Sequence, residues 1–205
     1  NRVGADPGPA TLRRARGLPR RGPAVVFPVL TDTRSPAYLQ ARYLDPGRAG
    51  RKYDNPSDTL ARNPRAVLVC TPRRGASAGA LLVCEGLPDA LTGAAAGYRA
   101  AAVLGAALPD VAVARRITEL AGDDPIVVAF DTDEGGRRGA ARLRDLLRSV
   151  TSDPVTVLAV PAGDLNDWAR HSGPAFPVEL ARQTRPPAPP TPAHPAPHPA
   201  PAPTL

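Results

Sequence analysis

The sequence contains no methionine, only two cysteines, one tryptophan and one lysine, and aromatic residues make up 4% of its 205 positions. The cysteines, Cys70 and Cys84, do not have the spacing of a zinc-binding site, so we expect buried thiols in a reducing cytoplasm, with a disulfide between neighbouring strand ends as the alternative. No stretch approaches the ~20 apolar residues of a membrane span, and no secretory signal is present. These absences favour a cytoplasmic protein that does not contact a membrane.

The missing methionine also bears on completeness. The chain begins with Asn1, so we expect it to be a fragment or an incomplete gene product.

The basic residues are unevenly distributed along the chain. Residues 1–84 carry 15 Lys and Arg against 5 Asp and Glu, whereas residues 85–205 carry 11 against 14. A basic first part joined to an acidic second part suits a polyanionic partner such as nucleic acid. A genome that favours arginine would explain why 25 of the 26 basic residues are Arg, but not why the excess lies in one part.

From Leu81 onward, apolar runs alternate with helix-like segments, which predicts an α/β fold with a mostly parallel sheet flanked by helices. The expected strands are 81–84, 99–104, 126–130 and 155–160, and the expected helices are 89–97, 111–121 and 136–149. Upstream, residues 24–70 read as a small β-rich unit with strands at 24–30, 37–44 and 66–70.

The composition divides the chain into four regions. We expect an Arg/Gly-rich segment at 1–22, a small basic α+β subdomain at 23–79, the α/β domain at 80–172, and a Pro-rich disordered tail at 173–205. Residues 186–205 hold 10 of the 27 prolines, which is typical of a polyproline-II-like tail.

Acidic residues directly follow the predicted strands. Glu85 and Asp89 follow 81–84, Asp131 and Asp133 follow 126–130, and Asp164 comes after the last strand. Carboxylates at the carboxyl ends of parallel strands converge in the crevice that binds ligands in such sheets. Because these charges repel one another, the pattern predicts a divalent cation site.

Each acid also has a simpler interpretation. Asp89 could cap the helix that follows it, either Asp164 or Asp167 could cap a helix near Trp168, and Glu134 is expected to be a solvent-exposed carboxylate. Gly86 is expected to allow a sharp turn that brings the backbone close to a phosphate or an ion.

The three acidic blocks, in this order and after these strands, resemble the Toprim domain, the metal-binding fold of bacterial-type primases, topoisomerases and some nucleases. The resemblance covers about residues 81–170. It implies Mg²⁺ (or Mn²⁺) as the cofactor and no organic cofactor. The implied catalytic residues are Glu85, Asp131 and Asp133, and the implied metal ligands are these three together with Asp89 and Asp164.

The first part of the chain resembles the basic subdomain that precedes Toprim in bacterial DNA primases, through 26–30, the strand with Arg42, and 51–57. This resemblance implies that Arg42, Arg51, Lys52 and Asn55 contact template and nucleotide. A lysine retained where arginine is otherwise used suggests a need for a compact charge, and chance is the alternative. Tyr53 could pack against the protein or stack on a base.

Together the resemblances imply a primase-like nucleotidyltransferase that makes short RNA primers on single-stranded DNA from nucleoside triphosphates during DNA replication. The sequence lacks the N-terminal Cys/His zinc module of that family and a helicase domain, so a replicative helicase would be contacted through missing regions. The alternatives are a Toprim nuclease and a non-catalytic nucleic-acid-binding fragment of a phage or plasmid replication protein. A topoisomerase is disfavoured because no domain with a nucleophilic tyrosine fits into 205 residues.

Overall fold

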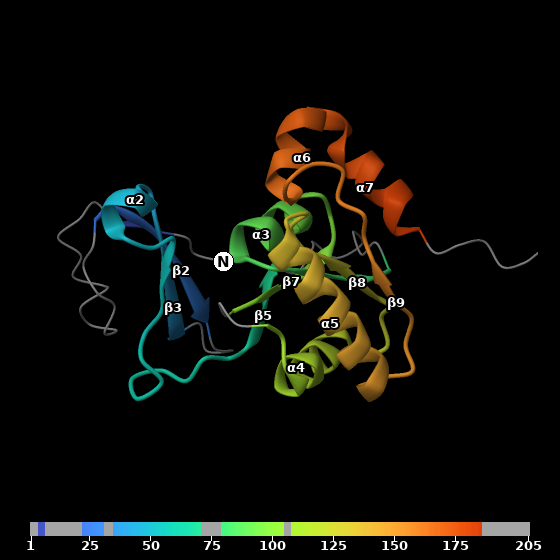
Figure 1. The fold of residues 1–205 in the computed structure, drawn as a ribbon, viewed down its shortest axis with the longest axis horizontal. Coiled ribbons are helices and arrows are strands. Elements are labelled where there is room, and N and C mark those ends of the chain that lie inside the picture. Colours follow the sequence, from blue (N-terminus) through green and yellow to red (C-terminus); the bar gives the residue numbers. More distant parts are fainter. Residues whose placement is uncertain (1–3, 7–21, 31–34, 71–78, 105–107, 186–205) are drawn as a thin grey trace, which may run out of the picture.

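The computed structural model describes residues 4–6, 22–30, 35–70, 79–104 and 108–185, and these residues form two β-sheets (Figure 1). The first sheet is antiparallel, with the strand order β1-β2-β3-β4. Its elements are β1 (Gly4–Asp6), β2 (Ala24–Leu30), β3 (Pro36–Tyr43), the short helix α2 (Pro46–Ala49) and β4 (Tyr53–Asp54). Residues of β2, β3 and α2 form a small hydrophobic core, which consists of Ala24, Val26, Leu39, Ala41, Tyr43 and Ala49.

The second sheet has the strand order β5-β7-β6-β8-β9, with β6, β7, β8 and β9 parallel. Its strands are β5 (Ala66–Cys70), β6 (Leu81–Cys84), β7 (Arg99–Val103), β8 (Ile126–Ala129) and β9 (Val155–Val157). The helices are α3 (Leu87–Ala95), α4 (Val111–Ala121), α5 (Glu134–Val150), α6 (Leu165–Ser172) and α7 (Phe176–Thr184), with a 3-10 turn η1 (Gly173–Ala175) before α7. The predicted α/β fold with a mostly parallel, helix-flanked sheet is confirmed.

Alternate strand residues of the second sheet pack into two separate apolar layers. Leu82 and Cys84 of β6 face the helices α3, α6 and α7, whereas Leu81 and Val83 face α4 and α5 (Figure 1). Because side chains alternate between the faces of a strand, an all-apolar run such as β6 is stable only when both faces are covered. Phe27 and Tyr38 of the first sheet join the α3 layer, so the first sheet packs on this side.

The strand β5 was expected to belong to the small N-terminal unit, and this prediction is wrong. It pairs antiparallel with β7 at the edge of the second sheet. The physical reason is its two-sided burial: Val67 and Val69 enter the α3 layer, while Ala66 and Leu68 pack in the α4 and α5 layer.

The expectation of a disordered tail from residue 173 is also wrong for its first part. Residues 173–185 are ordered, and Phe176 and Leu180 of α7 are buried in the α3 layer. The ring of Phe176 contacts that of Trp168 edge-on, with 5.2 Å between centroids. The Pro-rich residues 186–205, most of the Arg/Gly-rich segment 1–22 and residues 71–78 lie outside the described residues.

The other strands and helices predicted above are present, and their observed bounds differ from the predicted ones only at the ends. Cys84 is a free, buried thiol, whereas the side chain of Cys70 lies outside the description. Among the described residues, no helix combines the length and apolar character needed to cross a bilayer.

We predict that Leu180→Ala destabilises the protein by about 2–5 kcal/mol, because it removes a fully buried side chain and leaves a cavity. Val178→Ala on the same helix is the matched control, since Val178 is 56% exposed and should change stability little. Chemical denaturation followed by circular dichroism measures both. Equal effects of the two substitutions would contradict a structural role for α7.

The start of α5 packs directly against the end of β8. A Cβ atom at Gly136 would lie 2.2 Å from the backbone oxygen of Asp131, whereas one at Gly135 would lie 3.4 Å from its nearest neighbour, a carboxylate oxygen of Asp133. Only glycine at position 136 therefore permits this close approach.

We predict that Gly136→Ala costs about 1–3 kcal/mol, because backbone must shift to relieve the overlap. Gly135→Ala should stay within about 1 kcal/mol of the wild type, since alanine favours the helix and its Cβ fits. Thermal unfolding of the two variants side by side gives the comparison. A Gly136→Ala protein as stable as Gly135→Ala would refute the close packing.

Candidate metal centre

Three aspartates from different elements meet at the carboxyl edge of the parallel strands. Asp131 follows β8, Asp89 lies in the first turn of α3, and Asp164 is the N-cap residue of α6. Each offers one carboxylate oxygen, and these oxygens all lie within 4.8 Å of one another. Asp89 is only 8% exposed, and Asp131 and Asp164 are partly buried. We call these three residues the acidic triad.

Two members of the acidic triad, Asp89 and Asp131, retain protons more strongly than ordinary aspartates. Burial, together with the charges of Asp164 and Asp131, raises the pKa of Asp89 to about 7. Burial also raises the pKa of Asp131 to about 6, with contributions from Glu85 and Asp164. A divalent cation would relieve both the repulsion and the loss of hydration, and an all-oxygen set suits a hard ion.

A hydrogen-bonded amide supports Asp89 from α6. The side-chain nitrogen of Asn166 donates to Asp89 Oδ1 over 2.6 Å, and Thr92 Oγ1 donates to the Asn166 side-chain oxygen. The sequence pattern did not single out Asn166. The available signal was an amide two residues after Asp164, within a block whose neighbouring polar positions are acids.

Glu85 and Asp133 lie beside the acidic triad and outside its 4.8 Å cluster. Partial burial raises the pKa of Glu85, and the charge of Asp133 acts in the same direction. Asp133 is exposed and caps α5, because its Oδ1 accepts a 2.7 Å hydrogen bond from the backbone nitrogen of Gly136.

The interpretation of the acidic residues as helix caps is confirmed for Asp164 and wrong for Asp89. Asp164 is an N-cap residue as well as a triad member, accepting from the backbone nitrogen of Asp167 at 2.7 Å. Asp89 is not a cap, because the N-cap of α3 is Gly86. Glu134 is exposed, as expected, and pairs with Arg138 at 3.1 Å. The chain does bend at Gly86, as expected, but the backbone of Gly86 is extended (φ −140°, ψ 163°), so the bend does not require glycine.

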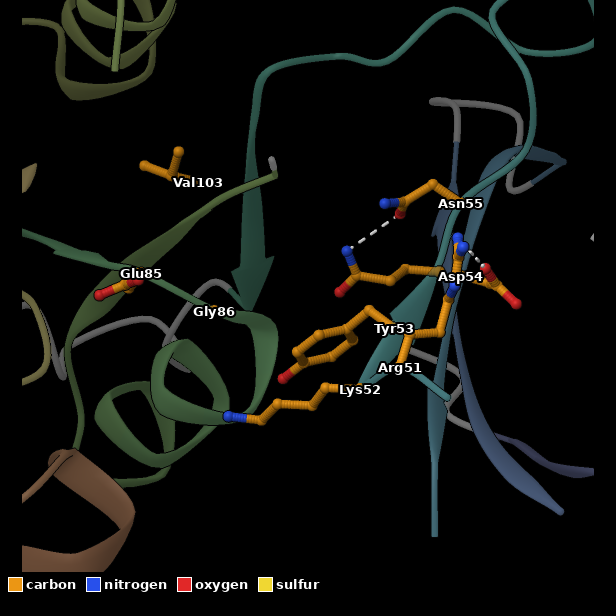
Figure 2. A pocket seen from close by; sticks show the side chains of 9 residues that line it. Arg51, Lys52, Tyr53, Asp54, Asn55, Glu85, Gly86 and Val103 are labelled. Carbon is orange, nitrogen blue, oxygen red and sulfur yellow. Dashed lines mark hydrogen bonds and ion pairs between the residues drawn. The ribbon is translucent and has the colours of Figure 1, made fainter. Parts of the chain in front are cut away.

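A cavity of about 490 Å³ lies between the first sheet and the carboxyl end of β6 (Figure 2). Its walls are formed by nine residues: Gln40, Arg51, Lys52, Tyr53, Asp54, Asn55, Glu85, Gly86 and Val103. Figure 2 shows the side chains of Lys52 and Tyr53 extending toward the part of the wall that holds Glu85 and Gly86. We call this space the inter-sheet cavity.

Lys52 is the cation that faces the acidic residues. Its charge lowers the pKa of Glu85 and of Asp131, in each case against the larger effect of burial. The Lys52 Nζ lies 5.7 Å from the centre of the Tyr53 ring, and the Arg42 guanidinium lies 5.8 Å from it. The Tyr53 ring therefore has two cations near it, and burial raises the pKa of its hydroxyl.

The other basic and polar residues expected here make contacts within the protein. Arg51 donates to the buried Asp54 over 3.1 Å, and Tyr43 donates to the same carboxylate over 2.6 Å. Asn55 accepts from the side chain of Gln40 at 3.1 Å. Arg51 and Asn55 thus hold the shape of the inter-sheet cavity in addition to lining it.

The sequence and the fold were compared with known proteins. A family model described as Toprim-like matches residues 82–169, and no curated protein sequence matches the chain.

Solved structures of primases match most of the chain. The RNA polymerase domain of Mycobacterium tuberculosis primase DnaG is 25% identical with a TM-score of 0.60, covering 83% of this chain and 61% of that one. A DnaG catalytic core is 19% identical with a TM-score of 0.66, covering 88% and 66%. A DnaG primase catalytic domain bound to single-stranded DNA is 22% identical with a TM-score of 0.62, covering 83% and 56%.

The chain therefore spans about three fifths of the length of the Mycobacterium tuberculosis domain. The family match covers the three acidic blocks, and the structural matches extend over the first sheet as well. Residues 82–169 match the Toprim-like family model, and the fold of the chain is similar to that of DnaG-type primase catalytic cores.

Proposed function

We propose that this chain is the core of a primase-like nucleotidyltransferase, which joins nucleoside triphosphates into short RNA primers on a single-stranded DNA template during DNA replication. The observation that carries the proposal is the position of Lys52. A lone lysine faces an acidic edge across a cavity of about 490 Å³, on a fold similar to primase cores. A nuclease would need the acidic triad but not the cation-bearing wall opposite it.

The acidic triad would hold the divalent ion, Mg²⁺ or Mn²⁺, that such chemistry needs. Its donors are carboxylate oxygens from Asp89, Asp131 and Asp164, which are the ligands that these hard ions prefer. When bound, the ion supplies charge neutralisation at the reacting phosphate and lowers the pKa of a hydroxyl nucleophile. Glu85 and Asp133 lie close enough to act electrostatically on the same region.

The protein's own residues would handle protons and phosphate charge. Glu85 lines the inter-sheet cavity with a raised pKa, so it suits the acceptance of a proton from the attacking hydroxyl. Lys52 would neutralise triphosphate or template charge as a compact cation, and Arg42 would add charge beside Tyr53. Asp133 would keep the start of α5 in place while contributing negative charge.

The proposed partners follow from this chemistry. Single-stranded DNA would occupy the basic side formed by the first sheet, and one similar primase structure contains single-stranded DNA. Nucleoside triphosphates would enter the inter-sheet cavity. A replicative helicase is a further proposed partner, and the proposed role in bacterial-type replication would take place in the cytoplasm.

Protons and the divalent ion should compete for the acidic triad. Because the pKa values of Asp89 and Asp131 are raised to about 7 and about 6, these two carboxyl groups favour the folded metal-free protein at low pH, and this contribution is lost as pH rises from about 4 toward 7. Stabilisation by Mg²⁺ should grow over the same range. The Mg²⁺ affinity should fall by about tenfold per pH unit between about pH 7 and about pH 6, and by up to about a hundredfold per unit below that, where both carboxyl groups must lose a proton.

Melting temperatures with and without Mg²⁺, measured from about pH 5 to about pH 8, check this expectation. Asp131→Asn is the control and should flatten the Mg²⁺ effect across the range. A Mg²⁺ shift that does not change with pH would contradict competition at these carboxylates.

Primer synthesis on single-stranded DNA with labelled nucleotides and Mg²⁺ tests the proposed activity. Asp131→Asn should reduce the rate on the order of a hundredfold or more, since metal-based charge stabilisation is worth several kcal/mol. Lys52→Ala should weaken binding and reduce the slope of log K against log salt by about one. Arg116→Ala, which removes a surface charge from α4, is the matched control and should behave as wild type.

The outcomes separate the candidate functions. Wild-type activity in both Asp131→Asn and Lys52→Ala would end the proposal. Mg²⁺-dependent loss of DNA without added nucleotides would favour a nuclease instead.

A further inference from the structure

The side-chain amide of Asn166 connects two helices at the acidic triad. Asn166 lies in the first turn of α6, and its nitrogen donates to Asp89 Oδ1 on α3 over 2.6 Å. Its oxygen accepts the hydroxyl of Thr92, one turn further along α3. All three side chains are partly or fully buried, so water competes poorly for these hydrogen bonds.

The Asp89 carboxylate determines which groups donate and which accept in this network. With a divalent cation bound, Asp89 would be ionised and would only accept hydrogen bonds, which matches the arrangement in which the amide nitrogen faces Asp89 and the amide oxygen faces Thr92. The Thr92 hydroxyl then has to donate. Reversing the amide would place its oxygen against the Asp89 carboxylate, where the two would repel each other.

The same end of α6 also supplies a triad carboxylate. Asp164 caps the helix two residues before Asn166, and its oxygen lies within 4.8 Å of those of Asp89 and Asp131. The first turn of α6 therefore both provides one triad member and orients another. It does so with a neutral amide, which adds no further negative charge to a site where three carboxylates already repel.

Helix α6 is itself firmly held. The indole nitrogen of Trp168 donates to Glu179 of α7 over 2.9 Å, and the Trp168 ring packs edge-on against Phe176. A rigid α6 gives the amide of Asn166 a fixed position from which to act on Asp89.

From this arrangement we infer that Asn166 is a positioning residue for the metal centre and that Thr92 fixes its orientation. The amide holds the plane of the Asp89 carboxylate so that this side chain is already arranged for a divalent cation with Asp131 and Asp164. This inference rests on the proposed function and adds to that site two residues that orient one of its metal ligands. Residues that orient metal ligands in this way typically change affinity by about 10–100-fold when they are removed.

The test measures Mn²⁺ binding to the full chain by electron paramagnetic resonance, with thermal unfolding as a parallel readout. Asn166→Ala should weaken Mn²⁺ binding by about 10–100-fold, and the isosteric Thr92→Val should weaken it by a smaller factor. Thr92→Ser keeps the donor and should restore near wild-type affinity. Asn63→Ala is the matched control, because it removes a partly buried amide that donates to the Leu104 carbonyl and not to a triad carboxylate.

A purely structural role would lower the melting temperature in both Asn166→Ala and Asn63→Ala and leave Mn²⁺ affinity unchanged. That result would overturn the inference while the metal site itself stands, because wild type would still bind. Absence of Mn²⁺ binding by wild type would overturn the metal centre of the proposed function and this inference together. Weak binding by Thr92→Val with recovery in Thr92→Ser supports the complete network, and equal affinities in these two variants would overturn the role of Thr92.

Discussion

Electrostatic repulsion among the aspartates of the acidic triad is the constraint around which the rest of the structure is arranged. The three carboxylates lie within 4.8 Å of one another, and Asp89 is almost entirely removed from water. Holding such charges together costs free energy, which appears as the raised pKa values of Asp89 and Asp131. The fold must therefore supply rigidity that keeps these side chains from turning outward.

That rigidity comes from two apolar layers on the faces of one sheet. The layer of α3, α6 and α7 fixes the helices that carry Asp89 and Asp164, and the layer of α4 and α5 fixes the strand end that carries Asp131. Close approaches complete the arrangement, as at Gly136, where α5 begins against the backbone of Asp131. Precision at the triad is thus a property of the packing on both faces and not of the acidic blocks alone.

Sequence reasoning predicted the parts that depend on local pattern. Apolar runs followed by acids were enough to expect parallel strands, and the convergence of Asp89, Asp131 and Asp164 follows from that topology. The sheet to which β5 belongs was missed, because a short apolar run does not reveal its pairing partner. Helix α7 was missed because its burial depends on contacts with Trp168 and the sheet, while its sequence adjoins a Pro-rich segment. The capping role of Asp133 and the amide of Asn166 depend on side-chain geometry that residue spacing alone does not determine.

The chemistry of Lys52 has a practical consequence. It is the single lysine of the chain, and it is exposed on a wall of the inter-sheet cavity. All other basic side chains except three histidines are guanidinium groups, which do not react as primary amines do. An amine-selective reagent would therefore label one side chain, at the cavity, besides the amino terminus of the chain. The labelling rate of Lys52, followed by peptide mapping, would report when that cavity is filled.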